Sequence, residues 1–314
     1  MARSSTVHVS VLAQEILTWL LPSGPFAGDD PDDAQAATSP SASMAGVPSD
    51  RGSVEGGIYV DGTCGGGGHT RLMLERMSAS DRILALDRDA DALARTSQTL
   101  SDPRLEYVHA NYCDIVEILR ERSIDGIDGI VLDLGLSSDQ LADGARGFSF
   151  DSPGELDMRF DTSVGEPAWQ LIQRLRTEQL ADLIYQYGEE RQSRRIARAI
   201  HEARVPGQRW TASQLAETVR RCFPRSGYDR IDPATRTFQA LRIAVNGELE
   251  SLEKVLQVLP DVFKPGGRAA IISFHSLEDR IVKWAFRNDP RWEDRKSTRL
   301  NSSHIPLSRM PSSA

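Results

Sequence analysis

The sequence predicts an α/β protein in which a parallel sheet is interrupted by a helical domain and then completed. Short apolar runs that end in Asp, Asn or Gly alternate with helix-like stretches between residues 57 and 143, as βαβ units require. Strand signals then fade, and residues 168–256 have helical spacing. A buried-strand pattern returns only at 268–274. No internal repeat is visible.

The elements follow in chain order. Residues 24–53 are rich in Gly, Pro, Ala, Ser and Asp, which predicts a disordered insertion. GIYVDGT, RILALDRD, LEYVHANY and GIDGIVLDLG are the expected strands, separated by helices such as TRLMLERM. Within 169–188, Leu and Ile recur at intervals of three to five, so one or two helices with a buried stripe are expected.

These patterns divide the chain into four parts. The tail lacks periodicity and resembles a translated sequencing adaptor, so we expect it to be disordered and non-native, with the true C-terminus missing. The predicted parts are 1–143 for the first half of the sheet domain, 144–240 for the helical domain, 241–295 for the second half, and 296–314 for the tail.

Composition narrows the class of protein. The 314 residues are 39% hydrophobic and 26% charged, which is ordinary for a globular protein that needs neither disulfides nor metal for its core. Cys64, Cys113 and Cys222 match no disulfide framework or zinc pattern, which indicates a reducing compartment. Gln14 and Glu15 interrupt the only early apolar stretch. We therefore expect a cytoplasmic protein with no membrane partner.

Charge is uneven along the chain. The net charge is −8, yet the segment 191–236 holds eleven Arg against four acids, a balance of +7, so the rest carries −15. This asymmetry indicates a surface for a polyanion on an acidic protein, although a solvated helix face is an equal alternative.

The first candidate site is the loop DGTCGGGGH at 61–69. Consecutive glycines permit positive φ and close approach of a ligand, and the following helix N-terminus offers free N–H donors. A dinucleotide fingerprint fails because Thr70 or Cys64 stands where a glycine is needed. The loop therefore predicts a nucleotide cofactor without a pyrophosphate fingerprint, and a plain glycine turn is the alternative.

Acids and an aromatic residue end the next strands. Asp87 ends the second run and could accept hydrogen bonds from ribose hydroxyls, or it could cap the next helix. Asp133 closes the fourth run, where it could instead serve only the loop that follows. Because ligands bind beyond the carboxyl ends of strands in open α/β sheets, Asp61, Asp87, Tyr112 and Asp133 should face one crevice.

A series of motifs then makes a family resemblance specific. In order along the chain they are HVSVLAQE, DGTCGGGGH, LALDRD, DLGLSSDQL, GFSF, DMR, YGEER, IARAI, DPATRTFQALRI and SFHSLEDRIVK. From His8 to about Lys283 the sequence resembles the bacterial small-subunit ribosomal RNA (cytosine-N4) methyltransferase H family. The resemblance implies a Rossmann-like S-adenosylmethionine domain with an inserted helical domain, and methylation of the exocyclic amine of a decoding-site cytidine in 16S rRNA.

The same resemblance implies the site residues. The implied cofactor contacts are Gly67, Gly68, His69, Asp87, Tyr112, Asp133 and Gln140. The chain departs from the family in three places: the insertion at 24–53, Asp232 where His is frequent, and a missing basic segment after about Asp294.

Mechanism adds further candidates. The amine of cytosine is a poor nucleophile, so acceptors must hold its N–H groups. We expect Asp133, with Ser137 and Ser138, to serve this step without a metal ion, because the six histidines show no ligand spacing.

An unpaired base also needs stacking and edge contacts, for which Phe148, Phe150 and His275 are candidates, although two Phe at alternating positions are common in cores. For the RNA backbone the candidates share helical spacing on one stripe, and they are Arg191, Arg194, Arg195 and Arg198. Two other functions stay open: an RNA-binding ribosome-assembly factor without turnover, and a nicotinamide-dependent oxidoreductase.

Overall fold

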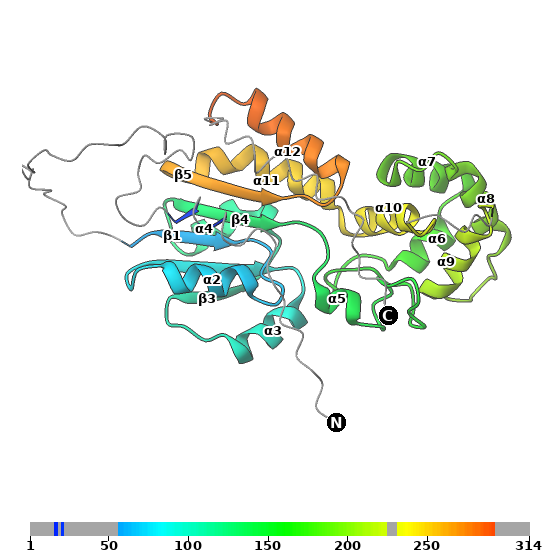
Figure 1. Cartoon of the computed structure of the whole chain (residues 1–314), viewed down its shortest axis with the longest axis horizontal. Coiled ribbons are helices and arrows are strands. Elements are labelled where there is room, and N and C mark those ends of the chain that lie inside the picture. The colour runs from blue at the N-terminus through cyan, green and yellow to red at the C-terminus, as the bar shows by residue number, and fades with distance from the viewer. Residues whose placement is uncertain (1–15, 18–19, 22–55, 225–230, 293–314) are drawn as a thin grey trace, which may run out of the picture.

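The computed structural model describes residues 16–17, 20–21, 56–224 and 231–292. The described chain is elongated: a parallel sheet with its flanking helices lies at one end, and a group of helices lies at the other (Figure 1). The predicted insertion at 24–53 and the predicted tail at 296–314 lie outside the described residues. Within the described part, no helix is both long and apolar enough to span a bilayer, and the predicted compartment stays a prediction.

One sheet organises the first part of the molecule. Its order is β3-β2-β1-β4-β5 and every neighbouring pair is parallel. The central strands are continuous apolar runs because both faces of a parallel sheet are covered by helices; Ile83 to Leu86 are fully buried. The strands are β1 (Ile58–Asp61), β2 (Arg82–Asp87), β3 (Leu105–His109), β4 (Ile127–Asp133) and β5 (Phe263–Ile272).

Helices cover the sheet and build the second part. On the sheet side they are α2 (Gly68–Arg76), α3 (Ala90–Thr99), the 3-10 turn η1 (Tyr112–Asp114), α4 (Ile115–Glu121), α5 (Ser138–Ala142), α11 (Glu248–Val262) and α12 (Ser276–Asn288). The second part comprises α6 (Ala168–Arg174), α7 (Thr177–Gly188), α8 (Ser193–Glu202), α9 (Ala212–Arg220) and α10 (Thr235–Asn246).

Two main apolar cores match these two parts. One lies between the sheet and the helices α4, α11 and α12, with Ile130 and Leu132 at its centre. The other joins α6 to α10 around Ile184 and Leu215. A smaller cluster seals the opposite face of the sheet with α2 and residues 16–17 and 20–21. The predicted fold class, a Rossmann-like sheet with an all-helical insertion, is confirmed.

The predicted domain limits stay a prediction. The helix α10 runs without a break across the expected limit between residues 240 and 241. It ends at Gly247, which adopts a left-handed conformation (φ 58°) and turns the chain directly into α11. At its C-terminal end, the helical part is thus connected to the sheet part by one tight glycine turn.

Candidate active site

One cavity lies beyond the carboxyl ends of the strands, where an open parallel sheet binds ligands. The loop after β1, the ends of β2 and β4, the turn η1, and the starts of α5, α11 and α12 all contribute to it. Its lining residues with polar side chains are Thr63, Cys64, His69, Asp87, Arg88, Tyr112, Asp133, Ser137, Ser138, Asp139, Gln140, Glu248 and Glu278.

The glycine loop forms one wall. Gly65 (φ 48°) and Gly67 (φ 76°) have left-handed backbones, and Gly67 is the N-cap of α2. A Cβ on Gly66 would meet no atom within 4 Å, so the loop leaves space on its exposed side. Gly68 and His69 line the cavity, whereas Gly67 does not and instead shapes the turn. No side chain caps α2, so its first N–H groups are available to a ligand.

Asp87 braces this loop from the end of β2. One oxygen accepts a hydrogen bond from Gly65 N at 2.7 Å, and the other accepts from Asp89 N at 2.8 Å. Burial raises the pKa of Asp87 to about 6, although these two N–H donors lower it. The alternative that Asp87 caps the next helix is wrong, because Asp89 accepts from the N–H groups of Asp91 and Ala92. Since a carboxylate has about four acceptor sites, Asp87 retains capacity for ribose hydroxyls.

Asp133 ends β4 beside the glycine loop. Its backbone N–H donates to the Thr63 hydroxyl at 2.7 Å, and its Oδ2 lies 3.3 Å from His69 Nε2. Burial would lower the pKa of His69, but the carboxylates of Asp133 and Asp61 raise it. The other oxygen of Asp133, Oδ1, is buried without a hydrogen-bond partner. A buried unsatisfied acceptor at the tip of a strand indicates a ligand that donates to it.

Tyr112 and Gln140 flank these acids. Tyr112 is 8% exposed in η1, where burial raises its pKa, so the phenol stays neutral. Gln140 forms a capping box with Ser137 at the start of α5, which orients both side chains. Ser138 is exposed at the first position of α5 and also lines the cavity. The structure therefore brings every implied cofactor residue except Gly67 to the cavity wall. Asp61, which was also expected to face this crevice, is fully buried, accepts from the Thr70 hydroxyl and does not line the cavity.

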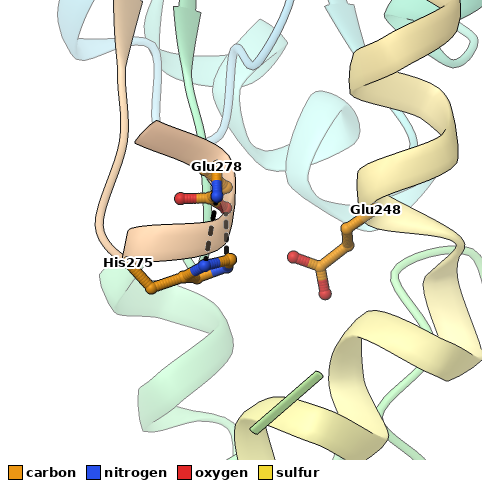
Figure 2. A group of neighbouring side chains, drawn as sticks. All are labelled: Glu248, His275 and Glu278. Carbon is orange, nitrogen blue, oxygen red and sulfur yellow. Dashed lines mark hydrogen bonds and ion pairs between the residues drawn. The ribbon is translucent and has the colours of Figure 1, made fainter. Parts of the chain in front are cut away.

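Two buried cavity-lining acids were not predicted. Glu248 begins α11 and Glu278 lies in the first turn of α12, and both are buried. His275, the N-cap of α12, lies between them, and the three ligand-type atoms are within 4.8 Å of one another (Figure 2). Their sequence spacing could not show this, because Glu248 comes from a different helix. His275 itself does not line the cavity.

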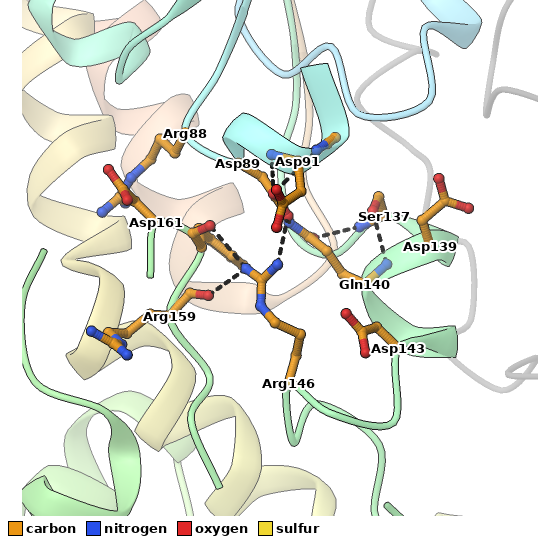
Figure 3. Close-up of polar contacts among 12 residues, drawn as sticks. Arg88, Asp89, Asp91, Ser137, Asp139, Gln140, Asp143, Arg146, Arg159 and Asp161 are labelled. Carbon is orange, nitrogen blue, oxygen red and sulfur yellow. Dashed lines mark hydrogen bonds and ion pairs between the residues drawn. The ribbon is translucent and has the colours of Figure 1, made fainter. Parts of the chain in front are cut away.

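A buried network joins this site to the helical part. Arg146 donates to Asp89 Oδ2 at 3.0 Å and to the carbonyls of Arg159 and Phe160 at 2.6 and 2.9 Å. Gln140 Nε2 also donates to Asp89, at 3.2 Å (Figure 3). The N-cap of α3 is thereby fixed to the segment that carries Phe160, which lines the cavity.

The two predicted stacking residues lie elsewhere. Phe148 is 5% exposed in the helical core and stacks on Phe160 with ring centroids 5.8 Å apart. Phe150 packs edge-on against Phe238 at 4.8 Å. Both therefore serve the core. Sequence analysis missed two cavity aromatics, Phe160 and Phe274, and the Arg88 guanidinium lies 5.7 Å from the ring of Phe160.

The predicted arginine stripe is only partly correct. Arg194, Arg195 and Arg198 are exposed on α8, opposite its buried Ile196 and Ile200. Arg191 precedes the helix, because α7 ends at Gly188 and α8 begins only at Ser193. The stripe on the helix therefore has three members. Buried Glu190, just before Arg191, lies 3.9 Å from the guanidinium of Arg236.

The fold and the cavity define a class: parallel-sheet enzymes that hold a nucleotide cofactor over the strand ends with a glycine loop and an acid on the second strand. Within that class, the model of the MraW methylase family matches residues 5–301, and the chain belongs to this family. The predicted family and the predicted methyltransferase activity are confirmed, in preference to an oxidoreductase or a factor without turnover.

Relatives support the assignment. A protein of Sorangium cellulosum named Ribosomal RNA small subunit methyltransferase H is 46% identical over 91% of this chain and 81% of its own length. One of the same name from Rhodopirellula baltica is 44% identical over 92% of this chain and 83% of its own. A solved structure titled a putative rRNA-methylase from Clostridium thermocellum is 26% identical in the aligned part, which covers 27% of this chain and 46% of that one. Its TM-score of 0.23 is too low to describe the fold.

Proposed function

We propose that this methyltransferase uses S-adenosylmethionine to methylate the exocyclic N4 amine of a cytidine in the decoding region of small-subunit (16S) ribosomal RNA. The observation that supports this most is the meeting of the glycine loop, Asp87, Tyr112 and Asp133 in one cavity. These residues follow four different strands, so chance does not explain why they meet in one cavity. The cofactor supplies an electrophilic methyl group on a positively charged sulfur.

The residues of the cavity fit this cofactor. Asp87 retains acceptor capacity for ribose hydroxyls, and the ring of Tyr112 offers an apolar surface for adenine. The first N–H groups of α2 can receive a carboxylate group. The space beside Gly66 lets a ligand approach the backbone. Each part of the cofactor therefore has a partner of suitable chemistry.

Asp133 is the proposed acceptor for the target amine. Its Oδ1 is buried and unsatisfied, which suits an N–H donor, while its Oδ2 lies 3.3 Å from His69 Nε2. An acceptor that holds an N–H group increases the electron density on nitrogen and so opposes the delocalisation of its lone pair into the ring. Ser137 and Ser138 follow on the same loop. The Ser137 hydroxyl caps α5 by accepting a hydrogen bond from Gln140 N, so we assign Ser137 a role in holding the loop.

The helical part is the proposed RNA surface. Arg194, Arg195 and Arg198 on α8 are exposed and can contact phosphates without disturbing the core. With Phe148 and Phe150 in the core, Phe160 is the better candidate for stacking on the extruded base, because it lines the cavity.

The test is methyl transfer from labelled S-adenosylmethionine to small ribosomal subunits, followed by mass spectrometry of the nucleosides. N4-methylcytidine at one decoding-region position is the expected product. A labelled nucleoside of another kind, or no transfer to RNA by a folded protein that binds the cofactor, would contradict the proposal.

A further inference from the structure

Glu248 and Glu278 have no role in the function described so far, yet both line the cavity. Glu278 is 2% exposed and Glu248 is 7% exposed. Buried carboxylates are costly unless cations or hydrogen bonds hold them. Their side chains converge on one place from α11 and α12 (Figure 2).

The two acids differ in what holds them. Both oxygens of Glu248 accept from the buried guanidinium of Arg242, at 2.8 and 2.9 Å, so a cation already neutralises this carboxylate. Glu278 accepts one hydrogen bond from Phe274 N at 2.9 Å through Oε2. Its Oε1 lies 3.1 Å from His275 Nε2, but that nitrogen makes no hydrogen bond. Glu278 is therefore the carboxylate with acceptor capacity to spare.

The histidine ring sets the charge of Glu278. Nδ1 of His275 accepts from the backbone N–H of Glu278 at 3.4 Å, so in the neutral ring the proton resides on Nε2, which lies 3.1 Å from Glu278 Oε1 without the alignment of a hydrogen bond. Burial would raise the pKa of Glu278, but His275 and Arg242 lower it. The remaining ionisable groups that face it are Glu248 from α11 and Tyr112 from η1. Glu278 thus stays ionised inside the cavity.

This arrangement favours a bound amine over a metal ion. A metal would need a lone pair on His275, but Nδ1 uses its lone pair at the helix cap and Nε2 carries the proton. A metal would also lie beside the Arg242 cation, which already occupies both oxygens of Glu248. An N–H donor needs only the open acceptor site of Glu278.

Neighbouring strands bring Glu278 and Asp133 to the same wall. Asp133 ends β4, and its register partner Ile272 ends β5, shortly before Phe274 and Glu278. Leu134 N donates to Ile272 O at 3.0 Å, so the two strand ends stay together past the last pair.

We propose that Glu278 is a catalytic residue that binds one N–H of the target cytidine amine and takes up its proton, with His275 as the residue that positions it. This inference rests on the proposed function. Asp133 Oδ1 accepts the other N–H. As the N4–carbon bond forms, the carbon–sulfur bond breaks and its electron pair goes to sulfur. The positively charged amine then transfers one proton to Glu278, which leaves N4-methylcytidine, a neutral thioether and a neutral carboxylic acid.

The first test compares Glu278→Gln with the parent protein at saturating S-adenosylmethionine, in single-turnover transfer to small ribosomal subunits. Gln keeps an oxygen for Phe274 N but cannot accept a proton. We expect a rate at least about 100-fold lower, with the cofactor dissociation constant within threefold of the parent value. Asp279→Asn is the matched control, because Asp279 is the next residue on α12, pairs with Lys283 and lies outside the cavity. Its rate should not change.

A second variant separates catalysis from helix capping. In His275→Gln the neighbour that lowers the pKa of Glu278 is absent, so the acidic limb of the pH–rate profile should move to higher pH. If Glu278→Gln does not fold, this shift alone decides: a shift supports the proposal and an unmoved limb overturns it.

The remaining outcomes each have a definite meaning. Transfer by folded Glu278→Gln within threefold of the parent rate overturns the proposal. Saturable Mn²⁺ binding that is lost in Glu278→Gln also overturns it, since the cluster would then be a metal site. A parent protein that binds the cofactor but methylates no RNA contradicts the proposed function itself, so the two failures are distinguishable.

Discussion

Cofactor binding should depend on pH through Asp87. Burial raises the pKa of this carboxyl to about 6 in the free protein. Ribose hydroxyls that donate to the carboxylate favour its charged form, so the bound state has a lower pKa. Binding then requires the acid to lose its proton whenever the pH is below 6. At pH 5 about one free molecule in eleven is ionised, so the apparent affinity should be about tenfold, or about 1.4 kcal/mol, weaker than at neutral pH.

Folding stability should change in the opposite direction. Because the folded pKa of about 6 lies above the ordinary value of 3.8, the folded state holds the proton more tightly than the unfolded chain. The contribution of Asp87 to stability is therefore fully present below pH 3.8 and is lost as the pH rises through 6. Acidification from pH 6 toward 4 should weaken cofactor binding while this group stabilises the free protein.

Calorimetric titration with S-adenosylmethionine at pH 5, 6 and 7.5 measures the effect, and two buffers of different ionisation enthalpy report the released proton. Asp87→Asn should bind S-adenosylmethionine more weakly than the parent protein, by about 1 to 3 kcal/mol, and its affinity should lose the part of the pH dependence that Asp87 causes. Asp91→Asn, an exposed acid in the first turn of α3, is the control. A dissociation constant that changes less than threefold between pH 7.5 and 5, or an unaltered slope in Asp87→Asn, would refute the ribose assignment.

Three other changes test separate parts of the molecule. Asp133→Ala should lose methyl transfer even at saturating cofactor, and full recovery of the rate there would limit Asp133 to cofactor binding. Replacing Arg194 and Arg198 together by Gln should reduce the salt dependence of RNA binding without altering cofactor affinity. The logarithmic slope should fall by about 0.7 to 0.9 for each phosphate that the protein no longer neutralises. A fall in melting temperature with no change in slope would indicate a structural role. Arg146→Met should lower the free energy of unfolding by about 3 kcal/mol in urea because it breaks a buried pair, whereas Arg95→Met, at a half-exposed contact, should change it by less than about 1 kcal/mol.

Local chemistry made the strand ends predictable from the sequence. Apolar runs that stop at an acid become strands because a parallel sheet is buried on both faces, and Asp87 and Asp133 are indeed the last residues of β2 and β4. The glycine loop needed only its own residue types to be located. The contents of the cavity wall nearest the sheet could therefore be predicted without knowledge of how the rest of the chain packs.

The opposite wall could not be predicted, because it depends on long-range packing. Glu278 sits in the motif SFHSLEDRIVK, where an acid in the first turn of a helix is ordinarily a surface residue. Only the approach of α11 buries it beside Glu248. Likewise, Arg191 has the spacing of a helical stripe, but Glu189 adopts a left-handed backbone (φ 50°) that ends α7 and delays the next helix.

Asn246 explains why the helical part and the cofactor site act on one cavity. It is 4% exposed at the end of α10, where its amide binds Met158 O and Phe160 N, each at 2.7 Å. Its backbone carbonyl accepts at 2.6 Å from Arg88, the residue that directly follows Asp87 at the end of β2. One residue thus connects Phe160 on the cavity wall, the segment that follows β2, and the turn into α11. A displacement of the helical part would therefore have to move Phe160 and the start of α11 together.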